Sequence, residues 1–412
     1  MKKRVILIIS IILIVLVDSV LIFYSVKKKK EPNKSEVTNI KETNTVIETE
    51  EEETLTSEII NDLTYEFDKK VYIKDIIKKD TDELLDTTVL GNQTKTITID
   101  NTLYTINYVV KDTKKPLILG GTTKSTTVGK KINLVNKFMC GDNHDSRPNC
   151  YIDGEYDINK VGTYNLTYVA IDSSGNKSTK AFKLKVKKES KSSGSSSSST
   201  TTPKRTKIKT YINKYKTDKT KVGVDVSAWQ DNINWEKAKK DGVEFAMIRL
   251  GYGPTSNNEL KLDNWFKRNI KETKKYNIPR GIYFYSYANS KEEAIREVKY
   301  IVKELDKEKL ELPIAFDWEN WNSFNKYKVS FKELNDIANT FIEECEKNGY
   351  EGMLYSSAYY LNHIWKDYNK TWLAYYTSNN DFSKPFNMWQ LTSSGKVNGI
   401  PGSVDIDILY NN

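Results

Sequence analysis

The chain has few of the side chains on which nucleophilic and metal-dependent enzymes most often rely. Its 412 residues include only two histidines and three cysteines. A Ser-His-Asp or Cys-His enzyme would have to use His144 or His363, and neither stands in the sequence context of a nucleophile. We also find no zinc-spaced Cys/His cluster, no phosphate-binding glycine loop and no aromatic RNA-binding signature. We therefore expect no metal or cofactor in the functional site and no nucleic-acid partner.

The cysteines are not expected to be catalytic. Cys140 and Cys150 bracket the loop GDNHDSRPN, and this pair is compatible with a disulfide outside the cell. Cys345, within FIEECEKNG, is expected to be a single thiol on a helix.

The formal net charge of +9, from 64 Lys+Arg against 55 Asp+Glu, is modest and spread along the chain. It suits contact with an anionic surface, such as a cell wall or lipid head groups, better than contact with nucleic acid.

The first 30 residues (1–30) predict a membrane anchor with basic flanks. The 22 residues from Val5 to Val26 (5–26) are almost all apolar, with Lys or Arg on both sides. As a helix they would reach ~33 Å, enough to cross a bilayer. Asp18 interrupts the run, and a carboxylate is costly there unless it lies toward an interface. The alternative is a cleaved signal peptide centred on Val5–Val17, but no small-x-small cleavage pattern follows it.

Composition divides the rest of the chain into five parts. Residues 31–60 are polar, include ETEEEE, and predict a disordered acidic stalk. Residues 61–115 and 116–188 alternate apolar and polar residues in short runs, which is typical of antiparallel strands. Residues 189–206 contain SKSSGSSSSSTTTP and predict a flexible linker. Residues 207–412 form the last and largest predicted domain.

The two β domains resemble the immunoglobulin-like modules of bacterial surface proteins. The resemblance rests on VGTYNLTYVAIDSSGN in the second domain and on DTKKP at the junction. It implies two small β-sandwiches that act as spacers, with binding to the cell wall as the alternative role.

The last domain contains eight short strand-like runs with helix-like or irregular segments between them. They are VGVDVS, FAMIRLGY, RGIYFYSY, LPIAFDWE, GMLYSS, TWLAYY, FNMWQL and VDIDILY. Helical segments such as SKEEAIREVKYIVKELDKE, with a capping box at Ser290 and Glu293, separate the early runs. This order predicts a parallel β/α barrel. Because the gaps after the fifth run are short, we expect fewer full helices in the later part.

Strand alternation brings several carboxylates to one end of this barrel. In LPIAFDWE, Asp317 and Glu319 lie on one face and Phe316 and Trp318 on the other. Bulky apolar residues suit the side that packs under helices, so the carboxylates are expected to point inward at the C-terminal end of the strand, where barrel enzymes have their active sites. The same argument turns Asp225 inward on the first strand.

On the eighth strand, alternation turns Asp405 and Asp407 inward. The first and eighth strands are neighbours in a closed barrel, so the acidic groups converge. Crowding and burial raise the pKa of at least one carboxyl in such a group. A protonated acid beside an ionised partner is the arrangement that glycoside hydrolysis needs.

At this point the motifs resemble a known family. GVDVSAWQ, GIYFYSYA, FDWE, WLAYY, MWQL and GIPGSVDIDIL occur in the order seen in glycoside hydrolase family 25, the Chalaropsis-type lysozymes or N-acetylmuramidases. The resemblance covers residues 221–410. It implies an irregular barrel, without metal or cofactor, that hydrolyses the β-1,4 bond between N-acetylmuramic acid and N-acetylglucosamine in peptidoglycan.

The resemblance also implies roles for single residues. Glu319 corresponds to the general acid. Asp317 corresponds to its partner, which either orients and stabilises a reaction of the substrate's own 2-acetamido group or serves as base or nucleophile. Asp225 and Asp405 match two further acidic positions of the family site, and Tyr283 is placed to hydrogen-bond the sugar.

Two positions depart from the family pattern, and several aromatic residues extend the site. Trp318 stands where a smaller apolar residue is common, and Asp407 stands where the last motif often reads D-x-N. Flat rings near strand ends can stack on sugars or pack in the core. The candidates for sugar binding are Tyr285, Tyr355, Trp372, Tyr375 and Trp389, with Trp229 also near a strand end.

Three other classes of protein compete with this interpretation. A chitinase-like barrel would need an acid at position 315, where this chain has Ala315. A catalytically inactive wall-binding or adhesion protein would not need all four acidic positions. A membrane-tethered spacer leaves the barrel unexplained. We therefore expect a single-pass membrane protein with its C-terminal bulk outside the cell, whose partners are peptidoglycan glycan strands and the lipid bilayer, with no obligate protein partner evident.

Overall fold

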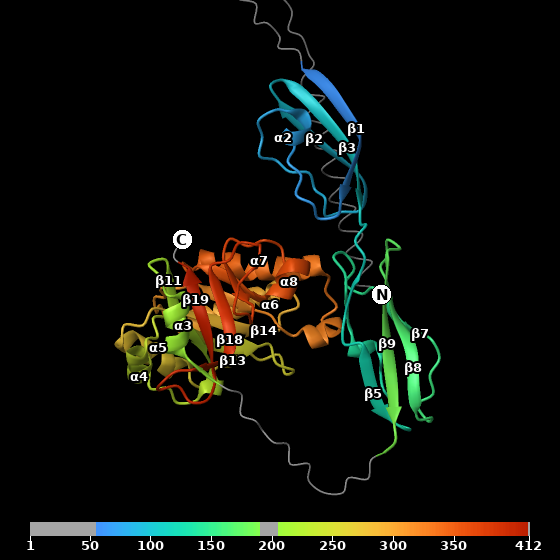
Figure 1. Cartoon of the computed structure of the whole chain (residues 1–412). Coiled ribbons are helices and arrows are strands. Elements are labelled where there is room, and N and C mark those ends of the chain that lie inside the picture. The colour runs from blue at the N-terminus through green and yellow to red at the C-terminus, as the bar shows by residue number, and fades with distance from the viewer. Residues whose placement is uncertain (1–54, 190–204, 411–412) are drawn as a thin grey trace, which may run out of the picture. The chain divides into compact units, whose positions relative to one another are not determined.

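The computed structural model describes residues 55–189 and 205–410 (Figure 1). The expected membrane segment 5–26, most of the expected stalk and most of the serine-rich linker lie outside these residues. Within the part that is described, no helix is both long enough and apolar enough to span a bilayer.

The first β domain is a single three-stranded sheet. Its strands lie in the order β1 (Thr56–Glu66), β3 (Thr102–Lys111) and β2 (Gly91–Ile99), with β1 parallel and β2 antiparallel to β3. Alternate residues of β3, from Tyr104 to Val110, are buried against the segment around the short helix α2 (Lys74–Ile77). A helix and loops cover the sheet where we expected a second sheet, so the predicted sandwich is wrong here. The domain also begins at Thr56, inside the range expected to be stalk.

The second β domain has two sheets. Its strands are β4 (Leu117–Leu119), β5 (Thr123–Thr127), β6 (Met139–Gly141), β7 (Asn149–Asp153), β8 (Gly162–Ile171) and β9 (Lys177–Lys187), and the 3-10 turn η1 (Val135–Lys137) precedes β6. The larger sheet has the strand order β5-β9-β8-β7, and the smaller sheet pairs β4 with β6. Residues of both sheets, among them Ile118 and Leu184, share one apolar core. Cys140 and Cys150 form a disulfide that joins β6 to β7.

The last domain is built around a closed ring of eight strands. In ring order these are β11 (Thr220–Val226), β12 (Ala246–Gly253), β14 (Arg280–Ser286), β15 (Ile314–Asp317), β16 (Gly352–Ser357), β17 (Thr371–Ala374), β18 (Met388–Lys396) and β19 (Val404–Tyr410). The eight predicted runs correspond to these strands. Two short strands that are not part of the ring pair with it: β10 (Thr206–Lys207) pairs with β18, and β13 (Lys261–Leu262) pairs with β12.

Helices follow the early strands and become short after the fifth. They are α3 (Ile208–Tyr215), α4 (Trp235–Asp241), α5 (Phe266–Lys275), α6 (Lys291–Leu305), α7 (Phe331–Lys347) and α8 (Ala358–His363), with the 3-10 turns η2 (Ala228–Gln230) and η3 (Trp321–Lys326). Ser290 begins α6 as predicted, because its side chain accepts a hydrogen bond from the Glu293 amide. The reciprocal bond of the predicted capping box is absent, since the Glu293 side chain accepts from the amide of Asn289 instead of Ser290. Ser330 and Glu333 form a full capping box at the start of α7.

The ring is not wholly parallel, which corrects the prediction. β19 runs antiparallel to both β18 and β11 and closes the ring between them (Figure 1). No helix stands between β18 and β19, only a loop. A connection without a crossover helix brings the chain back in the opposite direction, as in a hairpin.

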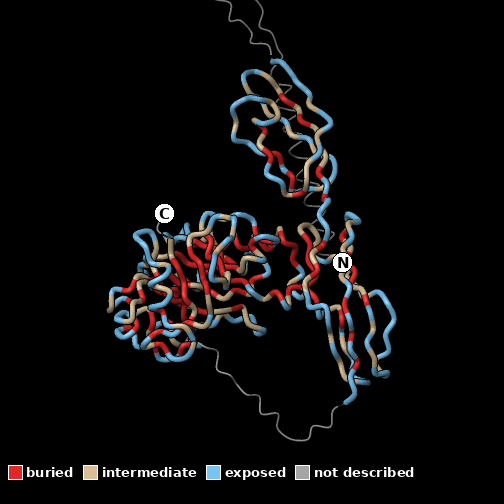
Figure 2. Tube along the Cα trace, in the orientation of Figure 1, coloured by how far each residue is buried: buried red, intermediate tan, exposed pale blue. Residues whose placement is uncertain are grey.

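Buried residues run along the strands of the barrel (Figure 2). They form two separate apolar cores, one on each side of the strands. Ile314, Phe316 and Trp318 belong to the outer core under the helices. Ala315 and Met353 belong to the inner core. The alternation predicted for β15 is therefore confirmed, and the carboxylate face of this strand is the inner one.

The inner core leaves no room at Gly223, which generates a prediction. A Cβ built at this position would lie 2.5 Å from the ring of Phe245. We expect Gly223→Ala to lower the free energy of unfolding of the barrel by about 1–3 kcal/mol, because overpacking forces buried side chains to shift. All eight tryptophans lie between residues 229 and 389, so tryptophan fluorescence during thermal unfolding reports on the barrel alone.

Two further variants test this explanation. Gly121→Ala, where a Cβ meets no atom within 4 Å, should leave the transition unchanged. Adding Phe245→Leu to Gly223→Ala should recover part of the loss. Equal stability of Gly223→Ala and the parent chain would contradict the packing described for the inner core.

Candidate active site

Four strand-end carboxylates meet at one end of the barrel. Asp317 is the last residue of β15, and Glu319 follows two residues later. Asp225 lies near the C-terminal end of β11. Because β19 is antiparallel to β11, its N-terminal end lies at this same end of the barrel, and Asp405 pairs directly with Asp225. The antiparallel direction of β19 therefore does not change the predicted result, which is that these four carboxylates lie at one end of the barrel.

A neutral amide holds Asp225 in place. The Nε2 of Gln390 on β18 donates a hydrogen bond of 2.9 Å to Oδ2 of Asp225. The Oε1 of Gln390 accepts hydrogen bonds of 2.9 Å from the hydroxyls of Tyr355 and Tyr376. Gln390 is buried, so this network fixes both its own orientation and that of the carboxylate.

Asp407 lies one inward position deeper than Asp405. It is fully buried and pairs with Gly223 on β11 and with Gln390 on β18. The Nε1 of Trp372 donates a hydrogen bond of 2.9 Å to its Oδ1. The extra carboxylate of the last motif therefore lies beneath the site.

Burial raises the pKa of every carboxyl in this group, and repulsion by neighbouring carboxylates adds to the rise for all of them except Asp405. Burial raises the pKa of Asp225 well above its usual range, and the charges of Asp405 and Asp407 add to the effect. Burial likewise raises the pKa of Asp407, with a further contribution from Asp405. Burial raises the pKa of Asp405 to about 6.

The two carboxyls of the FDWE motif share this behaviour. Burial raises the pKa of Asp317, the charge of Glu319 adds to the rise, and Arg249 opposes it. Burial of the carboxyl also raises the pKa of Glu319, with Asp405 adding to the rise and the Tyr355 hydroxyl opposing it. Glu319 as a whole residue is exposed. Its acid group is therefore shielded by neighbours yet reachable from solvent.

Tyr283 and Arg249 complete the centre of the site. Burial raises the pKa of the Tyr283 hydroxyl, and the charges of Asp225, Asp317 and Asp405 all act on it, which places this hydroxyl among the carboxylates. Arg249 pairs with Tyr283 across β12 and β14, and its guanidinium binds Asp263 at 2.7 Å.

The predicted aromatic residues divide into two groups. Tyr285 and Tyr355 lie near the carboxylates, because Glu319 and Asp317 raise the pKa of both. Trp372 is buried and reaches the site only through Asp407.

The other two aromatic candidates are held away from the carboxylates. Trp389 belongs to the outer core, where its ring packs against Tyr215. The hydroxyl of Tyr375 bonds to Asp381 at the surface. The structure therefore does not bring Trp389 or Tyr375 to the acidic group.

Sequence reasoning missed Gln390, Tyr376 and Arg249. Gln390 lies in the quoted motif MWQL, and alternation with Met388 of the inner core was a signal that it points inward. Tyr376 follows β17, and no sequence pattern marks its exposed ring (59% exposed) as a partner of Gln390. Trp229, which was noted, is 85% exposed on the turn η2 directly after β11.

A groove lies at the same end of the barrel as the acidic group, although none of the four carboxylates belongs to its lining. Its volume is about 680 Å³, and its lining includes Tyr252 at the end of β12, Tyr287 after β14 and Asn320 after β15. Tyr287 connects this groove to the carboxylates, because its ring lies 5.2 Å from that of Tyr285 and Asp317 acts on its pKa.

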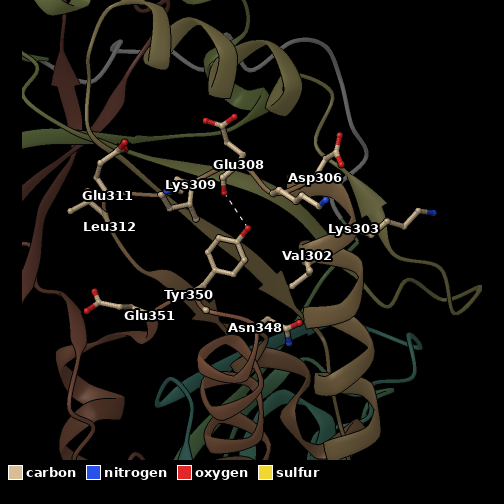
Figure 3. A pocket seen from close by; sticks show the side chains of 13 residues that line it. Val302, Lys303, Asp306, Glu308, Lys309, Glu311, Leu312, Asn348, Tyr350 and Glu351 are labelled. Atoms are coloured by element: carbon tan, nitrogen blue, oxygen red, sulfur yellow. Dashed lines mark hydrogen bonds between the residues drawn. The ribbon is translucent and has the colours of Figure 1, made fainter.

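A larger pocket of about 910 Å³ lies at the opposite end of the strands (Figure 3). Its lining includes Leu312, just before β15, and Glu351, just before β16. Three of the four acidic residues of its lining form ion pairs, Glu308 and Glu311 with Arg280 and Glu351 with Lys370. Tyr350 spans the pocket and donates a hydrogen bond of 3.1 Å to the Glu308 carbonyl.

The arrangement at the carboxylate end suits acid catalysis. It combines a solvent-accessible acid, an adjacent buried carboxylate and a groove lined by tyrosines and amides. In the described residues, the one group of three side chains close enough to hold a metal ion lies outside the barrel, at Asp112, Asp142 and Asp172.

Comparison with known proteins places this geometry in a family. Residues 224–400 match the model of glycosyl hydrolases family 25. The chain is 26% identical over 194 residues to the uncharacterized protein YegX of Escherichia coli (strain K12), covering 45% of this chain and 68% of that protein. It is 25% identical over 199 residues to lysozyme M1 of Streptomyces globisporus, covering 44% of this chain and 65% of that protein.

Two solved structures are also similar to the chain. The spore cortex lytic enzyme SleM of Clostridium perfringens has 22% identity and a TM-score of 0.42, covering 48% of this chain and 69% of that one. The modular autolysin LytC of Streptococcus pneumoniae has 25% identity and a TM-score of 0.43, covering 59% and 56%. The match of residues 224–400 to the family model assigns the C-terminal part of the chain to glycosyl hydrolases family 25.

Proposed function

We propose that the chain is a peptidoglycan hydrolase that cleaves the β-1,4 bond between N-acetylmuramic acid and N-acetylglucosamine. The observation that carries the proposal is the meeting of Glu319, Asp317, Asp225 and Asp405 beside a solvent-open groove, with raised pKa values throughout. The family 25 match and the similarity to lysozyme M1 support the substrate class.

Glu319 acts as the general acid. It is the one exposed residue among the four, and its raised pKa extends to higher pH the range over which the carboxyl holds a proton. It donates this proton to the glycosidic oxygen as the bond breaks. Charge develops on the sugar at the same time, so an anionic partner is needed on the other side.

Asp317 is that partner. Its Oδ1 is buried and has no hydrogen-bond partner within the protein, so it is free to act on the sugar. Arg249 lowers the cost of its negative charge. Once Glu319 is protonated, the repulsion that raises the pKa of Asp317 disappears, and Asp317 ionises more readily.

Asp225 and Asp405 set the electrostatic field around these two groups. Asp405 contributes to the raised pKa of Glu319, and Asp225 is oriented by Gln390. Tyr283, which lies among the carboxylates, is placed to donate a hydrogen bond to the substrate or to an intermediate. Trp229 and the tyrosines of the groove offer flat faces to sugar rings.

The parts before residue 205 serve as a tether. We propose that residues 5–26 anchor the chain in the cell membrane, and that the two β domains and the serine-rich linker carry the hydrolase outside the cell. The apolar run and its basic flanks support the anchor. The Cys140–Cys150 disulfide supports an oxidising location.

The first test removes the acid. We expect Glu319→Gln to reduce hydrolysis of purified peptidoglycan by about 10²–10⁴-fold, because an amide cannot supply the proton. Glu351→Gln makes the same chemical change at the opposite end of the strands, and it should leave activity near that of the parent chain. Mass spectrometry of the muropeptides that the parent chain releases should find muramic acid at their reducing ends. The proposal would be refuted by glucosamine at the reducing ends, or by a parent chain that releases no reducing ends.

The second test concerns pH. The pKa of Glu319 is raised above its usual value, so protonated acid is present below that raised pKa and is lost as pH rises through it. We expect kcat/KM to fall over this range. Asp405→Asn removes a charge that raises the pKa of Glu319, so it should move the falling limb to lower pH in addition to reducing activity.

The control for this profile is Asp367→Asn, at an exposed aspartate paired with Lys384. Its pH limb should coincide with that of the parent chain. A limb that does not move in Asp405→Asn would mean that Glu319 is not the titrating acid.

The third test concerns the exposed ring of Trp229. We expect Trp229→Ala to raise KM for glycan strands roughly two- to tenfold, which corresponds to one lost ring contact. Because the side chain is 85% exposed, the unfolding transition should not change. Trp229→Phe keeps a flat ring and should retain most of the affinity; equal KM for all three chains would exclude a contact with sugar.

A further inference from the structure

Three buried aspartates cluster where the first β domain joins the second. Each directly follows a strand: Asp112 follows β3, Asp142 follows β6 and Asp172 follows β8. Each offers a carboxylate oxygen, and these oxygens lie within 4.8 Å of one another. Asp112 is 6% exposed and Asp142 is fully buried. The three residues are separated by 30 positions each in the chain, so the fold alone brings them together.

Two oxygens of this cluster have no partner within the protein. They are Oδ2 of Asp112 and Oδ1 of Asp142. The other oxygen of each carboxylate is held by amide donors. Oδ1 of Asp112 accepts from Asn143 Nδ2 at 2.9 Å, and Oδ2 of Asp142 accepts from the amides of His144 and Asp145 at 2.8 and 2.9 Å. Each carboxylate is thus fixed by one oxygen and keeps the second free.

The third carboxylate, that of Asp172, accepts a hydrogen bond at each of its two oxygens. Asn176 donates to Asp172 twice, through its backbone amide at 2.7 Å and its side-chain amide at 2.9 Å. The same side-chain amide donates to the carbonyl of Asp112 at 3.0 Å. A carboxylate oxygen has more than one lone pair, so Asp172 can still bind a cation.

The charge of this cluster is not balanced by the protein. In residues 55–189 and 205–410, no lysine, arginine or histidine forms an ion pair with any of the three aspartates. Buried carboxylates without a counter-charge are strongly unfavourable. Burial raises the pKa of Asp142 to about 6, and the charges of Asp112 and Asp172 add to this.

We propose that Asp112, Asp142 and Asp172 bind a calcium ion. The donors are all hard oxygen atoms, which suit Ca²⁺ or Mg²⁺ rather than a transition metal. Ca²⁺ accepts six to eight oxygen ligands in flexible geometry, whereas Mg²⁺ dehydrates reluctantly and keeps several waters. Three convergent carboxylates in a buried place therefore favour Ca²⁺. This proposal does not depend on the hydrolase assignment.

The ion would join separate parts of the chain. Asp112 ends the first β domain, whereas Asp142 and Asp172 belong to the second. The carbonyl of Asp142 also accepts a hydrogen bond of 2.7 Å from the amide of Phe331, in the first turn of the barrel helix α7. Calcium bound at this point stiffens the junction of the two β domains and the segment that contacts the barrel.

The test measures calcium binding to the full-length chain after treatment with a chelator. Isothermal titration should show one saturable site for Ca²⁺ and weaker binding of Mg²⁺. Asp142→Asn keeps an acceptor for the two amides but removes the charge, and it should weaken Ca²⁺ binding by about tenfold or more. Asp153→Asn, at an exposed position of β7 in the same domain, is the matched control and should bind as the parent chain does.

Scanning calorimetry provides a second readout, the melting temperature with and without calcium. Without calcium, Asp142→Asn should melt at a higher temperature than the parent chain, because one repelling charge is gone. With saturating calcium the order should reverse, because the parent chain binds calcium more tightly and therefore gains more stability from it. Absence of a saturable calcium site, preference for Mg²⁺, or equal binding by Asp142→Asn would overturn the proposal.

Discussion

The closure of the barrel by an antiparallel strand is the constraint on which the site depends. β19 fits between β18 and β11 and hydrogen-bonds to both. Its register sets Asp405 against Asp225 and Asp407 against Gln390. A slip of one residue would turn both carboxylates out of the barrel and their apolar neighbours in. The acidic group therefore exists only because the two apolar cores fix this register.

Alternation along the strands explains which features the sequence could predict. It placed Asp317 and Glu319 on the inner face, and Phe316 and Trp318 pack outside as expected. The same rule, applied to β18, would have placed Trp389 outside with its neighbour Gln390 inside. The direction of β19 was not predictable in this way, because an alternating strand reads the same in both directions.

Contacts between distant segments explain what the sequence could not predict. The strands of the first β domain alternate apolar and polar residues as the strands of a sandwich do, but the segment around α2 covers their sheet. Alternation along a strand shows that one of its faces is buried; it does not show whether a helix or a second sheet covers that face. The aspartates at 112, 142 and 172 each resemble an ordinary residue after a strand, in the first case within DTKKP. Only the packing of two domains brings their free oxygens together.

The two acidic groups of the protein face the same physical problem under different conditions. In the barrel, Glu319 is exposed to solvent and can exchange protons with it. The raised pKa of Glu319 helps its carboxyl to keep a proton that it can donate during catalysis. At the junction, amides already hold one oxygen of Asp112 and one of Asp142, and the second oxygen of each is buried without a partner in the protein. A proton there would neutralise one charge of three, whereas a divalent cation contacts all of them at once. The same residue type therefore favours catalysis in one place and ion binding in the other.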